Sequence, residues 1–128
     1  MIQYKLYPEE KLIILQIIDG CNFNELMELI QTYMQDPGYS PEFNGVLDMR
    51  EGRLDLTQEE VAQIAQFVQQ QRFAKGLWCH IVHDHRSTAL GMVYEQLISD
   101  EHPLQVFSTV KAASGFMGVN LSRYLKGP

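Results

Sequence analysis

The chain has 128 residues, of which 45% are hydrophobic, 10% aromatic and 20% charged. A chain of this length buries roughly two thirds of its unfolded surface, enough for one core without disulfide or metal staples. A second domain does not fit, so we expect a single domain over residues 1–128. Ten Lys and Arg residues against sixteen Asp and Glu residues give a formal net charge of −6. That balance argues against a nucleic-acid binder, which needs a basic face to neutralise phosphates.

The N-terminal residues predict a β-hairpin. Residues 2–6 alternate between apolar and polar side chains, as in a strand with one wet face, and residues 8–10 supply a turn. Residues 11–18 are nearly continuous in β-formers, which predicts a second strand that is covered on both faces and central in its sheet. This run is far shorter than the ~20 apolar residues of a membrane span. Residues 1–7 hold no apolar stretch of a signal peptide, so the mature chain is expected to begin where the sequence does.

Two sequence patterns predict where helices begin. Asn22 precedes Glu25 by three residues, and Thr57 precedes Glu60 by three, which is the spacing of a capping box. The order of elements predicts an α/β fold: a mixed, mostly parallel five-stranded sheet with an N-terminal β-hairpin, right-handed crossovers and four to five packed helices. After the hairpin we expect a helix from Asn22 to about Gln35, a strand at 46–49, a loop at 50–56, a helix from Thr57 to about 72–75, a strand at 77–83, a helix capped by Asp84 or Ser87 with Leu90, Val93 and Leu97 on one face and its end near Ser99–Asp100, a strand at 104–107, a helix from Ser108 or Thr109 to Gly118, and one more turn at 120–125.

Polar residues gather in the two loops that follow the third and fourth predicted strands. In open parallel sheets ligands usually meet the protein beyond the carboxyl ends of the strands, where loops feed helix N-termini. If the two strands are neighbours, the loops converge into a polar rim on which a phosphate or an acidic partner can dock. The structural alternative is that Asp48 pairs with Arg50 or Arg86, while Thr57 and Ser87 only cap helices. We define the rim as Asp48, Arg50, Arg53, Thr57, Asp84, His85 and Arg86.

Three histidines lie close together at the end of the fourth predicted strand. On a strand His80 and His83 face opposite sides, whereas His83 and His85 share one. Two ligands do not complete a zinc site, and a third would have to come from His102 or a carboxylate. We therefore expect structural histidines, with no metal and no other cofactor.

The two cysteines, Cys21 and Cys79, form no CxxC pair, which favours reduced thiols in a cytoplasmic protein. Cys79 and His80 are adjacent on the predicted strand and point apart, so neither activates the other. Because no other pair has the spacing of a nucleophile and its base, we do not expect an enzyme. A hydrolase is the distant alternative.

Several segments together resemble the bacterial SpoIIAA-like family, small stand-alone proteins related to STAS domains. The resemblance rests on residues 36–50, DPGYSPEFNGVLDMR, on the helix start TQEEV at 57–61, and on ALGMVYE at 89–95. It spans essentially the whole chain in order. It implies a βα superhelical fold shared with anti-sigma-factor antagonists and with the lipid-binding domain of Sec14-like proteins.

The resemblance implies little about activity. Anti-sigma antagonists present a phosphorylatable serine in an Asp-Ser-Ser-Gly-type segment after the third strand. The corresponding residues 53–58 read RLDLTQ, without that serine and without the glycine. Thr57 is the one hydroxyl near the equivalent place, and its expected role as a helix cap competes with phosphorylation.

Two functions of different classes are therefore expected. The first is a non-enzymatic STAS-like regulatory module that binds a protein partner or a small anionic ligand at the rim, as a monomer or weak homodimer without nucleic acid or integral membrane association. The second is a carrier or sensor of a small hydrophobic, lipid-like ligand. If the protein is a carrier, we expect methionines to line a pliable apolar pocket; if it is not, we expect them to fill the core. Those in question include Met27, Met34, Met92 and Met117.

Overall fold

The computed structural model describes residues 1–98 and 102–125 and has the expected α/β architecture. The predicted helix end near Ser99–Asp100 lies outside the described residues, and the described helix ends at Leu97. The strands are β1 (Ile2–Tyr7), β2 (Leu12–Asn22), β3 (Asn44–Asp55), β4 (Trp78–Ile81) and β5 (Leu104–Phe107); the helices are α1 (Phe23–Met34), α2 (Gln58–Gln71), α3 (His85–Leu97) and α4 (Val110–Met117), with 3-10 turns η1 (Pro8–Glu10) and η2 (Leu121–Arg123).

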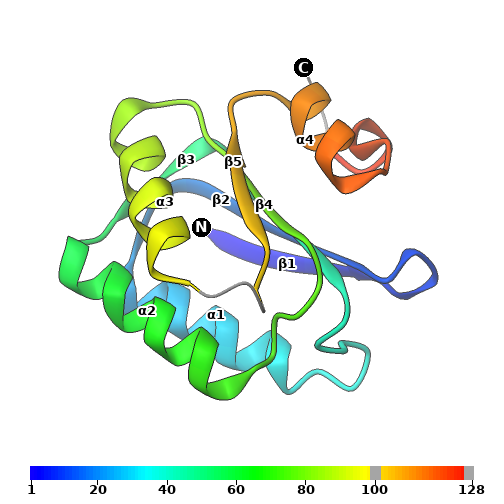
Figure 1. Ribbon diagram of the computed structural model, residues 1–128, viewed down its shortest axis with the longest axis horizontal. Coiled ribbons are helices and arrows are strands. Elements are labelled where there is room, and N and C mark those ends of the chain that lie inside the picture. The colour runs from blue at the N-terminus through cyan, green and yellow to red at the C-terminus, as the bar shows by residue number, and fades with distance from the viewer. Residues whose placement is uncertain (99–101, 126–128) are drawn as a thin grey trace.

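The five strands form one sheet in the order β1-β2-β3-β4-β5. β1 pairs antiparallel with β2, and all other neighbours are parallel. Helices α1, α2 and α3 cover one face, while α4 and η2 cover the other (Figure 1). The crossovers through α1, α2 and α3 always step to the next strand in the same direction, so crossovers of one hand place all three helices over the same face.

Strand alternation divides the core in two. Ile13, Leu15 and Ile17 of β2 face α1–α3, whereas Leu12 and Ile14 face α4. β2 is flanked by β1 and β3, so its near-continuous apolar run is buried on both sides, as expected. Among residues 1–98 and 102–125, no helix combines the length and the apolar character that crossing a membrane requires.

The third strand is longer than expected, since the predicted loop at 50–56 is mostly strand. β3 continues to Asp55 and pairs with β2 as far as Asn22, beyond a register shift between Gln16 and Ile18. Gly52 is part of this pairing: a Cβ there would lie 2.4 Å from the carbonyl oxygen of Ile17. The glycine therefore marks a close approach of two backbones rather than a loop. The charged residues of this segment alternate with buried ones, which is the pattern of a half-exposed strand.

The buried face of α3 also differs from the expectation. Leu97 is 44% exposed, and the buried positions are Ser87, Leu90, Gly91 and Tyr94. Two of these four residues, Ser87 and Gly91, are small. A helical pattern defined by large apolar side chains does not include them. The N-cap is Asp84, one of the two expected alternatives.

Candidate functional site

The loops after β3 and β4 lie at the same edge of the sheet, because the two strands are parallel neighbours. Asp48 pairs with Ile81, the last residue of β4, and β3 then runs on to Asp55. The rim residues are therefore spread along the strand and the two helix starts that follow. The strand order never reverses, so the sheet has no switch point at which diverging crossovers open a crevice.

Asp48 and Arg50 form an internal ion pair. The Asp48 residue is 2% exposed. Its Oδ1 accepts from Arg50 Nε at 2.9 Å and from the Arg50 backbone N–H at 3.1 Å, and its Oδ2 accepts from Arg50 Nη2 at 3.1 Å. Of the two partners considered for this carboxylate, the structure selects Arg50. A buried carboxylate with this compensation stabilises the end of the sheet and offers little to a ligand.

The other rim residues also make contacts within the chain. Arg86 donates from Nη2 to the carbonyl oxygen of Leu56 at 3.0 Å, and Arg53 lies 3.4 Å from Asp55 in an exposed pair. Thr57 caps α2 and is exposed. Asp84 caps α3 by accepting from the backbone N–H of Ser87 at 2.7 Å, which lowers the pKa of the Asp84 carboxyl. His85 and Arg86 are exposed at the start of the same helix.

The histidines do not come together as metal ligands. His83 Nε2 lies 3.2 Å from the carbonyl oxygen of Gly52, and β4 ends at Ile81, before His83. His102 Nδ1 donates to the carbonyl oxygen of Ala74 at 2.7 Å, and its Nε2 lies 3.2 Å from the Tyr94 hydroxyl. In the part of the chain that the structure describes, no three His, Cys, Asp or Glu side chains are arranged to hold a metal ion.

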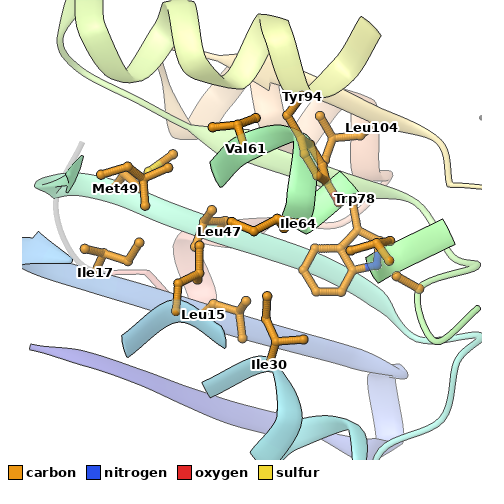
Figure 2. Packing of buried hydrophobic residues seen from close by; sticks show 14 of the residues in the cluster. Leu15, Ile17, Ile30, Leu47, Met49, Val61, Ile64, Trp78, Tyr94 and Leu104 are labelled. Carbon is orange, nitrogen blue, oxygen red and sulfur yellow. The ribbon is translucent and has the colours of Figure 1, made fainter. Parts of the chain in front are cut away.

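A cavity of about 70 Å³ lies between the sheet and the layer formed by α1, α2 and α3. We call it the core cavity. Figure 2 shows sheet residues Leu15, Leu47 and Trp78 pointing toward Ile30 and Ile64 of the helices. Every described residue that lines the cavity is buried, so it is an interior space. Its lining also includes Tyr33, Val61, Phe73, His80, Leu90, Gly91, Tyr94 and His102.

Two residues that line the cavity each carry a nitrogen with no hydrogen-bond partner among the described residues. The nitrogens are Nε1 of Trp78 and Nδ1 of His80, both fully shielded from solvent. Trp78 and His80 are two residues apart on β4, so both face the α1–α3 side of the sheet, while Cys79 between them faces α4. Burial, reinforced by His102, lowers the pKa of His80 to about 3, so its ring is neutral at physiological pH. Such orphaned polar atoms are unfavourable in an apolar interior unless something pairs with them.

The His80 ring is held in place from the helix side. It stacks on Tyr94 with 5.7 Å between ring centroids and an interplanar angle of 24°. Gly91, one turn before Tyr94, lets α3 approach the ring: a Cβ at this glycine would lie 3.7 Å from His80 Nδ1. Any group larger than hydrogen at residue 91 therefore occupies space beside the unpartnered nitrogen.

Sequence reasoning missed this cavity. It considered His80 as a metal ligand or a partner of Cys79, considered His102 as a metal ligand, and favoured a structural role for the histidines. It also expected methionines in any pocket, whereas none of the described lining residues is a methionine. Met92 is 53% exposed, because it lies on the outer side of α3. The sequence feature that could have indicated the cavity is the pair Trp78 and His80. Both are aromatic rings with a polar nitrogen, and both lie on one face of an otherwise apolar strand.

Comparison with known proteins identifies a fold. No protein-family model matches the chain, and no curated protein matches it. A similar solved structure is that of an uncharacterized protein from the DUF3478 family with a SpoIIAA-like fold, from Shewanella loihica PV-4. The TM-score is 0.59 at 10% sequence identity, covering 91% of this chain and 92% of that one. The expected SpoIIAA-like fold is thereby confirmed, and at this identity the likeness concerns the fold alone.

Proposed function

We propose that this protein is a non-enzymatic binding module that takes up a small molecule in the core cavity. The observation that carries the proposal is that two of the side chains lining the cavity, Trp78 and His80, each carry a buried nitrogen without a hydrogen-bond partner among the described residues. Cys79, a candidate nucleophile beside them in sequence, belongs to the core on the α4 side, and burial raises its pKa to about 12. Both facts favour binding over catalysis.

The size of the cavity bears on the ligand. One water needs about 10–15 Å³ of such space, so 70 Å³ corresponds to about five water-sized positions. An engineered cavity that admits benzene has about 150 Å³. Scaling from benzene gives about three heavy atoms and counting water-sized positions gives about five, so a small molecule of about three to five heavy atoms suits the cavity. A lipid-length chain requires the helix layer to move.

Two glycines provide a matched test. In Gly91→Ala the added methyl group lies between α3 and the sheet, 3.7 Å from His80 Nδ1 and 3.1 Å from Val106 of β5. In Gly115→Ala the same change on α4 meets nothing within 4 Å. Both changes favour a helix.

The assay is titration with neutral molecules of three to five heavy atoms, followed by the fluorescence of Trp78, the one tryptophan of the chain. We expect saturable changes in the wild type and in Gly115→Ala, and binding at least tenfold weaker in Gly91→Ala. Equal binding in both variants, or no response to any molecule, contradicts the proposal.

A second candidate is docking of an acidic protein partner or a small anion on the rim. The observation favouring it is that Arg53, His85 and Arg86 are exposed next to two helix N-termini. Titration with inorganic phosphate should then show binding that Arg86→Ala weakens while the melting temperature changes by a few degrees at most. Arg50→Ala is a poor test, because it leaves the buried Asp48 carboxylate without its partner. Phosphate binding that survives loss of Arg53 and Arg86 argues against the rim.

A further inference from the structure

The geometry points to an uncharged polar ligand for the core cavity, one that offers a hydrogen-bond acceptor to Trp78 Nε1. This inference rests on the proposed function and narrows it to a chemical class. Small amides, ketones and azoles belong to this class. Ions and pure hydrocarbons do not.

The unpartnered atoms define the polarity of the ligand. The Trp78 indole N–H is a donor only, so an acceptor must meet it. The neighbouring His102 shows that the interior otherwise pairs its polar atoms, since Nδ1 is bonded to Ala74 and Nε2 to Tyr94. Among the described residues, the lack of a partner is therefore specific to Trp78 and His80, two side chains that line the cavity.

The charge of the lining excludes ions. None of the described residues that line the cavity is Asp, Glu, Lys or Arg. His80 could carry a charge, but its lowered pKa, about 3, keeps it neutral. The pKa of His102 is lowered as well, mainly by burial. An ionic ligand would lose its hydration without gaining a counter-charge, which is strongly unfavourable in an apolar interior.

Ordered water is the competing occupant. A cavity of this size has room for water molecules, and a water placed beside either nitrogen would pair with it. A ligand replaces such water only if it reproduces the hydrogen bonds and also fills the apolar part of the space. Hydrocarbons satisfy the second condition and fail the first, which is why we exclude them.

Four molecules of four heavy atoms each separate these possibilities at constant size: acetamide, acetate, guanidinium and isobutene. Each is titrated into the ¹⁵N-labelled wild type. The readout is the indole N–H signal, which is a single peak because the chain has one tryptophan. We expect acetamide to shift it saturably, with a Kd no tighter than about 40 μM for four heavy atoms. The other three should bind at least tenfold more weakly.

Two variants locate the site. His80→Leu removes the unpartnered nitrogen and should weaken acetamide about three- to tenfold without weakening isobutene. The control is Cys79→Ala, a change on the same strand whose side chain lies on the α4 side, and it should leave acetamide binding unchanged. Should His80→Leu fail to fold, the wild-type series decides by itself.

The outcomes distinguish the two proposals. Acetamide binding above the other three supports the inference. Acetate or guanidinium binding as well as acetamide overturns it, as does isobutene binding equally or better, although either result leaves a cavity that takes up small molecules. If none of the four shifts the indole signal, water is the sole occupant, and both the inference and the proposed function fail.

Discussion

Gly45 is the position at which the structure makes its sharpest prediction. Gly45 of β3 is the register partner of Trp78 of β4, so both point to the same face. A Cβ at residue 45 would lie 2.3, 2.4 and 2.5 Å from three carbons of the fused indole ring. On its other side the ring stacks on Tyr33, with 6.3 Å between centroids and an interplanar angle of 30°. The indole is thus confined between a backbone and a second ring.

The change Gly45→Ala should be costly. The van der Waals contact distance between carbon atoms is about 3.5–4.0 Å. The rigid indole ring must therefore move by about 1 Å or more against Tyr33. Overpacking costs about 1–3 kcal/mol, and complete loss of a buried Trp costs about 3–5 kcal/mol. We expect a loss of about 3 kcal/mol in the free energy of unfolding. With an unfolding entropy of about 2.1 cal/mol/K per residue, this lowers the melting temperature by about 11 °C.

The assay is a double-mutant cycle read by thermal and urea unfolding. Trp78→Leu removes the fused ring, so Gly45→Ala should cost less than about 1 kcal/mol in that background, giving a coupling energy of about 2 kcal/mol. Gly115→Ala serves as the control for a glycine with open space around its Cβ, and it should not destabilise the protein. An equal cost of Gly45→Ala with and without the indole refutes the reasoning.

Three further predictions concern single groups. The folded-state pKa of His80, about 3, lies below the 6.5 of an unperturbed histidine, so the unfolded chain takes up the proton first and stability is lost as the pH falls below 6.5. Urea unfolding should therefore show the wild type losing about 2 kcal/mol more than His80→Leu between pH 7 and pH 5, and parallel profiles contradict this. Thr57→Ala removes one half of the α2 capping box and should lower the melting temperature by about 4 °C, or about 1 kcal/mol; an unchanged temperature argues against the cap. Burial raises the pKa of Cys21 to about 11 and that of Cys79 to about 12. Neither thiol should therefore react with a thiol reagent at pH 8 until denaturant is added. Reaction at the rate of free cysteine would show that the thiols are accessible.

Local chemistry explains which elements were predictable. The capping boxes at Asn22 and Thr57 both form, because a side-chain oxygen three residues before a backbone N–H needs no distant partner. The apolar run of β2 and the alternation in β1 likewise indicate strands wherever the rest of the chain lies. The C-terminal half of β3 was missed, since its strand character comes from pairing with residues 18–22 of β2.

The rim shows the same division between local and tertiary information. Spacing alone indicated that Asp48 lies near the end of a predicted strand and that Thr57 and Asp84 begin helices. Which cation Asp48 binds was left open, and the fold decided for Arg50 because the two side chains point to the same face of one strand. Whether the rim binds a partner stays a prediction.

The core cavity depended on tertiary structure alone. Nothing in the sequence shows that Trp78 and His80 line one cavity. Gly91 alone indicates only a helix position with low helix propensity. Their role becomes visible only when α3 packs on the sheet and brings Gly91 to the His80 ring, while the indole of Trp78 lies against Gly45. Patterns of hydrophobicity report which side of an element is buried. They carry no information on how well two buried surfaces fit, so a cavity and the unpaired atoms around it emerge only from packing.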